Sequence, residues 1–154
     1  MHESQTCIFC DIAFARISSH IVWQDSNYVA VLSPYPNTSG FTVLFPRKHI
    51  PSDGLQLDDQ QLFDLMSVAR KVSVLLREKL PVARVGLILE GYGIDHVHAK
   101  LIPMHGIPDG PWKPIISAPE ERRYYANYPG FIASHDGPIM NDSELDLILK
   151  KLLN

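Results

Sequence analysis

The chain has 154 residues, 45% of them hydrophobic and 20% charged, as in an ordinary globular protein of one domain. Its 14 basic and 17 acidic residues give a formal net charge of −3, which excludes the broad basic surface that nucleic acid polymers or anionic membranes attract. The short polar start, Met1 to Gln5, has no signal-peptide pattern, and the longest apolar stretch, Phe41–Pro46, is far too short to span a bilayer. We therefore expect a cytoplasmic protein with no nucleic acid and no membrane as a partner.

Five short segments rich in β-branched and aromatic residues predict strands. The first two are joined by Asp25, Ser26 and Asn27, residue types that favour a tight turn, so we expect them to form an antiparallel hairpin. The predicted strands are Ile21–Gln24, Tyr28–Leu32, Phe41–Phe45, Val85–Glu90 and His96–Ile102.

A long helix is predicted between Asp58, which can cap it with Gln61 as its capping-box partner, and Pro81, which ends it. A second amphipathic helix is predicted to begin near Asn141, with Glu144 as the partner of this cap. Its apolar stripe is Leu145, Ile148, Leu149 and Leu152. This order of elements favours an α+β fold, in which an antiparallel sheet of about five strands carries one long helix and a C-terminal helix.

The composition changes near the end of the last predicted strand. The region Pro103 to Pro138 holds seven of the twelve prolines, interleaved with aromatic residues. Because proline is disfavoured in helix interiors and central strands, we expect this region to be mostly irregular. We interpret residues 1–106 as the body that carries the chemistry. Residues 107–154 are interpreted as a proline- and aromatic-rich extension that belongs to the same domain.

The segment from Asp95 to Pro103 places chemically active side chains at alternate positions. In a strand, His96, His98 and Lys100 share one face, and the apolar residues between them share the other. This pattern puts two imidazoles and an ammonium about 6.6–7 Å apart along one face. The alternative is a solvated strand face that carries these residue types without using them.

Cys7 and Cys10 are the only cysteines of the chain, and their spacing is that of a zinc knuckle. In a protein without a signal peptide, such a pair indicates a metal or redox element before it indicates a structural disulfide. A four-coordinate metal site needs two further ligands. Two free thiols and a redox pair remain as alternatives to the metal site.

Three segments together resemble the histidine-triad (HIT) superfamily. They occur in the order typical of that family and cover about residues 7 to 106. The segments are Cys7-Ile8-Phe9-Cys10-Asp11-Ile12, then Gly40-Phe41-Thr42-Val43-Leu44-Phe45-Pro46-Arg47-Lys48-His49-Ile50, and finally His96-Val97-His98-Ala99-Lys100-Leu101-Ile102-Pro103.

The resemblance implies a nucleotide-binding hydrolase in which His98, the middle histidine of the motif, is the nucleophile. His98 attacks the α-phosphorus of a nucleotide or a dinucleoside polyphosphate-like molecule, and water then releases the nucleoside monophosphate from a nucleotidyl-histidine intermediate. A neutral imidazole is a good nucleophile near pH 7, and Lys100 on the same face disfavours its protonation. The nucleotide-binding residues implied are Ile8, Phe9, Ser33, Asn37, Gly93, His98 and Lys100.

The chain departs from the family pattern at several positions. Lys100 stands where the third histidine is usual, and either Lys100 or the nearby His105 is a candidate replacement for it. Ser33 stands where many members carry an acidic residue for the ribose hydroxyls, and Phe41 follows the glycine in place of a histidine. These changes affect the expected substrate more than the expected chemistry.

The resemblance also implies a structural Zn²⁺ site and a homodimer. Some bacterial members and the related galactose-1-phosphate uridylyltransferases bind zinc with a Cys pair and two histidines. The matching residues here are Cys7, Cys10, His49 and His96. Two functional alternatives to the hydrolase are a nucleotidyltransferase or phosphorylase on the same fold and a catalytically silent nucleotide-binding module.

Overall fold

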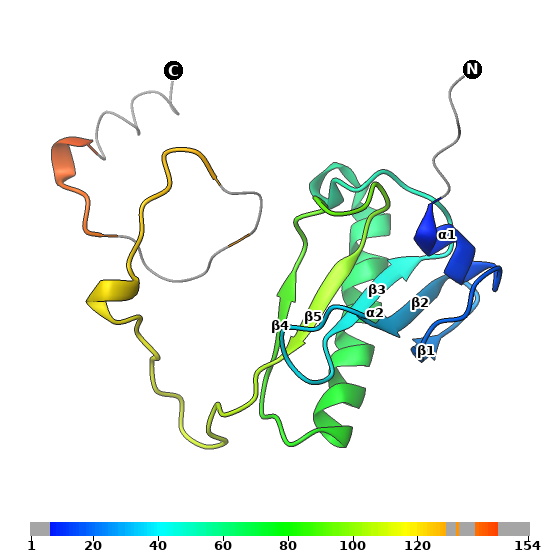
Figure 1. The fold of residues 1–154 in the computed structure, drawn as a ribbon, viewed down its shortest axis with the longest axis horizontal. Coiled ribbons are helices and arrows are strands. Elements are labelled where there is room, and N and C mark those ends of the chain that lie inside the picture. Colours follow the sequence, from blue (N-terminus) through cyan, green and yellow to red (C-terminus); the bar gives the residue numbers. More distant parts are fainter. Residues whose placement is uncertain (1–6, 129–131, 133–137, 145–154) are drawn as a thin grey trace. The chain divides into compact units, whose positions relative to one another are not determined.

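Five strands form one antiparallel sheet in the order β1-β2-β3-β5-β4, which confirms the predicted fold class (Figure 1). The computed structural model describes residues 7–128, 132 and 138–144. The chain divides into two compact units, Met1–Gly110 and Pro111–Asn154, and the sheet belongs to the first. The strands are β1 (Ile21–Gln24), β2 (Tyr28–Leu32), β3 (Thr42–Pro46), β4 (Val85–Ile88) and β5 (Ala99–Pro103).

The first hairpin forms because Asp25 satisfies the turn between its two strands. One oxygen of the Asp25 carboxylate accepts hydrogen bonds from the backbone N–H groups of Asn27 and Tyr28, at 2.8 and 2.7 Å. β1 then pairs with β2 in antiparallel fashion, as predicted.

The long helix, α2 (Asp59–Lys79), begins where its capping box predicts. The Asp58 carboxylate accepts from the Gln61 N–H at 2.8 Å, and the Gln61 side chain accepts from the Asp58 N–H at 3.2 Å. The helix ends before Leu80, next to Pro81. Within the described residues, no helix is both long enough and apolar enough to cross a bilayer.

The sheet has a separate apolar core on each face. On one face, α2 packs against alternate residues of the inner strands, among them Ala30, Leu44 and Ala99, which lie in register across β2, β3 and β5. On the other face, the short helix α1 (Ile8–Ala13) covers Val29, Val31, Val43 and Phe45. Lys100 pairs with Val43 and so belongs to this second face.

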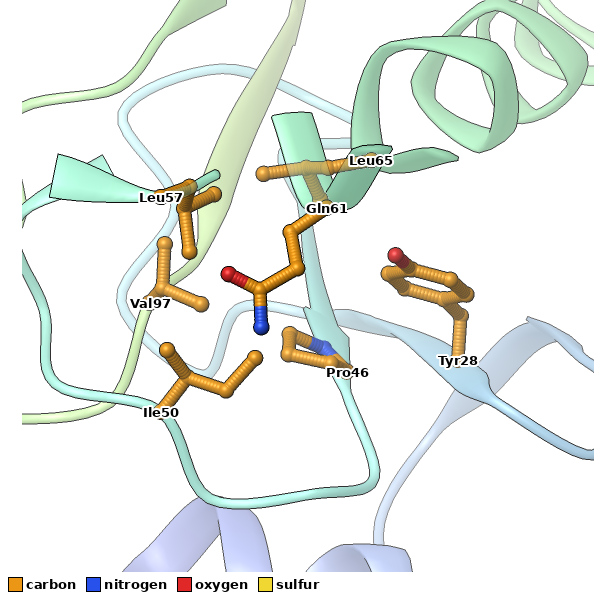
Figure 2. Close-up of a pocket in the computed structure, with 7 residues that line it drawn as sticks. All are labelled: Tyr28, Pro46, Ile50, Leu57, Gln61, Leu65 and Val97. Atoms are coloured by element: carbon orange, nitrogen blue, oxygen red, sulfur yellow. The ribbon is translucent and has the colours of Figure 1, made fainter. Parts of the chain in front are cut away.

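Under the start of α2 lies a small hollow of about 10 Å³, about the space of one water molecule (Figure 2). Its lining comes from the α2 side of the sheet: Tyr28, Pro46, Ile50, Leu57, Gln61, Leu65 and Val97. A cavity of this size cannot hold a nucleotide.

The second unit contains little regular structure within its described residues, as its prolines predict. A single 3-10 turn is formed by Pro119–Glu121. The cap predicted for the C-terminal helix is present, because the Asn141 side chain accepts from the Glu144 N–H at 3.0 Å. The apolar stripe predicted beyond it, from Leu145 onward, lies outside the described residues.

Candidate active site and metal centre

The two histidines of the predicted motif lie just before β5 and not within it. The expected strand from His96 to Ile102 in fact spans Ala99–Pro103, because the N–H of Val97 donates to the carbonyl of Ile50 at 2.8 Å and not to a neighbouring strand. The predicted strands at residues 41–45 and 85–90 likewise shift to 42–46 and 85–88.

The predicted alternation of faces holds through this segment. Val97, Ala99 and Leu101 pack in the core beneath α2. His96 and His98 point to the opposite face, where both rings contact the edge or face of Phe9. They are 0% and 3% exposed, because α1 covers them, so the alternative of a solvated strand face is wrong.

The ring of His98 is held in one tautomer by the backbone. Its Nδ1 lies 2.7 Å from the carbonyl oxygen of His96, and a carbonyl can only accept, so Nδ1 carries the proton. The other nitrogen, Nε2, therefore keeps its lone pair. The ring of Phe9 lies 5.2 Å from that of His98 and packs against it. His98 thus has an oriented ring with an unprotonated Nε2.

The surroundings of His98 keep the ring uncharged. Burial lowers the pKa of His98 from its ordinary value, and the positive charge of Lys100 acts in the same direction. The hydrogen bond to His96 and the negative charge of Glu90 oppose this shift without reversing it. A neutral ring at pH 7 is the nucleophilic form.

Lys100 pairs with a residue that the sequence reasoning missed. Its Nζ donates to Oε1 of Glu90 at 2.6 Å, and the two side chains are only 29% and 12% exposed. Glu90 follows β4, the neighbour of β5, and opposite charges on adjacent strands are the signal that could have found it.

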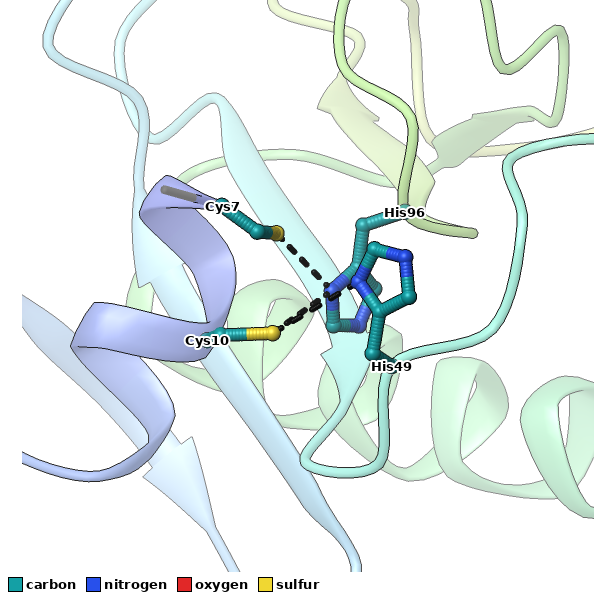
Figure 3. Close-up of side chains that lie close together, drawn as sticks. All are labelled: Cys7, Cys10, His49 and His96. Carbon is teal, nitrogen blue, oxygen red and sulfur yellow. Dashed lines mark hydrogen bonds between the residues drawn. The ribbon is translucent and has the colours of Figure 1, made fainter. Parts of the chain in front are cut away.

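The four side chains predicted as zinc ligands lie together (Figure 3). Cys7 and Cys10 come from the start of α1, His49 from the segment after β3, and His96 from the segment before β5. One ligand atom from each lies within 4.8 Å of all the others. Residues far apart in the sequence thus converge at one corner of the sheet.

The distances in this cluster fit a tetrahedral ion. Nδ1 of His96 lies 3.3 Å from Sγ of Cys7 and 3.7 Å from Sγ of Cys10, and Nδ1 of His49 lies 3.6 Å from Sγ of Cys10. Zinc bonds of about 2.3 Å to sulfur and about 2.0–2.1 Å to nitrogen, at tetrahedral angles, separate S and N by about 3.6 Å. The donor set and its geometry therefore support the zinc predicted from the sequence.

His96 is prepared as a ligand by its second nitrogen. Nε2 lies 2.8 Å from the carbonyl oxygen of Pro46 and donates to it, so Nδ1 is free to point at the two sulfurs. Burial lowers the pKa of His96, and the charges of His49 and His98 lower it too, against the hydrogen bond to Pro46. A neutral His96 is the form that binds a metal.

Known proteins resemble this chain in sequence and in fold, although no family model matches it. An uncharacterized HIT-like protein of Saccharolobus solfataricus is 26% identical over 127 residues, which are 79% of this chain and 91% of the relative. The solved HIT family hydrolase from Clostridium thermocellum aligns with a TM-score of 0.57 at 23% identity, over 69% of this chain and 96% of that one. The chain is therefore similar in sequence to HIT-like proteins and shares the fold of histidine-triad structures.

A solved zinc-bound histidine-triad protein from Mycobacterium smegmatis aligns with a TM-score of 0.61 at 20% identity. The alignment covers 66% of this chain and 78% of that protein. The fold that carries the Cys2His2 cluster here is therefore shared with a histidine-triad protein that is described as holding zinc.

Two residues of the predicted nucleotide pocket lie on α1, beside the histidines of the HIT motif. Phe9 is 6% exposed, and its ring stacks on that of Phe45 at a centroid distance of 4.3 Å. Ile8, in contrast, is 47% exposed. Phe9 thus supports the ring of His98, and Ile8 is the residue of the pair that faces outward.

Ser33, Asn37 and His105 lie toward the other end of the sheet. Leu32 pairs with Thr42, which pairs with Leu101, so Ser33 lies beyond this row and away from the start of β5. The Ser33 hydroxyl accepts from the N–H of Tyr35 at 3.1 Å, and Asn37 is exposed in the same loop. The ring of His105, past the end of β5, hydrogen-bonds the carbonyl of Ser39 at 2.9 Å, so it does not stand in for a third HIT histidine beside His98.

Arg47 of the Pro-Arg-Lys-His run uses its guanidinium for hydrogen bonds within the fold. Its guanidinium donates to the carbonyl of Ala13 at the end of α1, and to the Gln24 side chain at 2.7 Å. Its Nε donates to the carbonyl of Asp25 at 2.8 Å. Arg47 therefore fastens α1 to the first hairpin.

Two glycines of the loop before the HIT histidines should respond in opposite ways to alanine. Gly91 has a φ of +65°, and a Cβ there would overlap the backbone of Ser52, whereas a Cβ on Gly93 would meet nothing within 4 Å. We expect Gly91→Ala to lower the free energy of unfolding by about 3 kcal/mol or more, from strain and overlap. Gly93→Ala should change it by no more than about 0.5 kcal/mol. Urea denaturation measures both, and equal values would contradict this account of the loop.

Proposed function

We propose that this protein is a nucleotide-binding hydrolase that cleaves a phosphoanhydride or phosphoramidate bond at the α-phosphate. His98 forms a nucleotidyl-histidine intermediate in this reaction. The proposal rests on the single tautomer in which His98 is held. Its Nδ1 donates to the carbonyl of His96, which leaves the Nε2 lone pair for attack.

The neighbours of His98 support attack on a phosphorus atom. The ammonium of Lys100, two residues further along the same face, offers a positive charge to the phosphoryl oxygens as their charge grows in the transition state. The backbone at Gly93 is open to close approach by a ligand, and Ile8 offers an apolar surface to a base. Ser33 and Asn37 are proposed as more distant contacts of the same ligand.

Cys7, Cys10, His49 and His96 would hold a zinc ion next to this site. The ion would supply a fixed cross-link between α1 and the segment before β5, and no step of the reaction would pass through it. Since the carbonyl of His96 orients His98, a ligated His96 keeps the nucleophile in place. We also propose that the protein is a homodimer in the cytoplasm.

The covalent intermediate gives a direct test. The protein is mixed with diadenosine triphosphate, quenched at neutral or alkaline pH within one turnover, and analysed by mass spectrometry of its peptides. We expect a nucleotidyl adduct on the peptide that contains His98, and its absence during confirmed turnover would overturn the mechanism. Products formed with and without added phosphate then separate a hydrolase from a phosphorylase.

A further inference from the structure

The ion pair between Lys100 and Glu90 lies in the half-buried part of the site. Nζ and Oε1 are 2.6 Å apart, and the Glu90 side chain is 12% exposed. Ile88, the last residue of β4, pairs with Lys100 in antiparallel register, so the chain continues from Ile88 toward the end of β5 at which His98 lies. Glu90 is therefore placed on the His98 side of Lys100.

This pairing changes what position 100 can do. An imidazole at that position would exchange its proton with a substrate near pH 7, because its protonated and neutral forms have similar free energies there. The Lys100 ammonium instead donates one of its three N–H groups to the Glu90 carboxylate in a short charge-assisted hydrogen bond, which fixes the position of its charge. Lys100 is thus a fixed positive charge and a poor donor of a proton to a departing group.

The two bond types considered for the substrate differ in their need for that proton. When the Nε2 lone pair of His98 attacks the α-phosphorus of an anhydride, the P–O bond breaks and its electrons leave with a phosphate oxygen, which is stable as an anion. In a phosphoramidate the P–N bond breaks instead. The departing nitrogen must then receive a proton, because an amide anion is far too basic to leave.

We propose that the Glu90–Lys100 pair commits this site to nucleoside phosphoanhydrides over nucleoside phosphoramidates, with Glu90 as the positioning residue for the Lys100 charge. The proposal rests on the function proposed above. After the anhydride has been split, water attacks the phosphorus and the P–N bond to His98 breaks. The electron pair returns to Nε2, one proton of the water passes to solvent, and a nucleoside monophosphate leaves.

The test compares two probes that share one nucleoside, diadenosine triphosphate and adenosine phosphoramidate, through the ratio of their kcat/KM values. General damage to the fold lowers both values together, so the ratio reports the leaving group alone. We expect the wild-type protein to prefer the anhydride by at least about 100-fold, the lower end of what a missing general acid costs.

Three variants then test the pair itself. Lys100→Arg keeps a fixed positive charge and should retain the wild-type ratio. Glu90→Gln removes the carboxylate charge that engages the Lys100 ammonium, and Lys100→His introduces a group that can donate a proton. Each variant should therefore lower the anhydride-to-phosphoramidate ratio of kcat/KM values at least about tenfold. Lys71→Met, an exposed change on α2, is the control that should leave both rates as they are.

The outcomes separate this inference from the proposed function. Equal cleavage of the two probes by the wild-type protein, or a ratio unchanged in Glu90→Gln, would overturn the inference and leave the hydrolase standing. Failure of the wild-type protein to cleave either probe would overturn both. A ratio that narrows in Glu90→Gln and Lys100→His but not in Lys100→Arg supports the inference.

Discussion

Replacement of His98 by alanine should lower kcat on diadenosine triphosphate by at least about 10⁴-fold, the scale on which loss of a nucleophile acts. The reason is that the Nδ1 proton of His98 is committed to the carbonyl of His96, which leaves an oriented lone pair on Nε2, whereas the unprotonated nitrogen of His96 points at the cysteine sulfurs. Steady-state kinetics of purified protein measures the effect.

The fold of this variant needs its own control, because His98 is buried against Phe9 and alanine leaves a hole there. His98→Asn fills more of the space but has no ring nitrogen, so it should be equally inactive with a smaller loss of stability. Both variants should still bind adenosine monophosphate in calorimetry. Turnover in either one at a rate near that of the wild-type protein would exclude His98 as the nucleophile.

Replacement of His49 by glutamine should release zinc and lower the melting temperature by about 6–12 °C. Loss of one of four ligands removes at least about 3 kcal/mol of metal-linked folding free energy, and about 1 kcal/mol corresponds to 2–4 °C in a protein of this size. Metal analysis and thermal unfolding measure the two effects in the same samples.

His20→Gln is the matched control, since both histidines are exposed and only His49 belongs to the cluster. The wild-type protein, purified without added metal, should carry one zinc per chain, and His20→Gln should do the same. Should a chelator strip the wild-type metal without a change in melting temperature, the ion would not be a structural one.

The elements predicted correctly are those that local residues determine. The capping box at Asp58 and Gln61 and the turn at Asp25 are satisfied by hydrogen bonds within three residues, so the sequence itself contains their cause. The alternation from His96 to Leu101 is local in the same sense, and its faces were assigned correctly.

The features that were wrong or missed depend on distant partners. The start of β5 was placed too early because the N–H of Val97 is taken by Ile50, which lies far away in the sequence. The burial of the histidine face depends on α1, and the pairing of Lys100 depends on Glu90 across two strands. The local sequence around each of these residues does not indicate which distant residue it contacts.

The site can form only when α1 is held against the sheet. A helix of six residues does not persist in water by itself, so α1 stays in place through Phe9, Arg47 and the two cysteines that flank its first turn. The layer formed by α2 and the sheet does not depend on these links, because its core is separate. We therefore expect that loss of zinc weakens the attachment of α1, and with it the order of the face that carries His98, while the layer of α2 and the sheet stays folded.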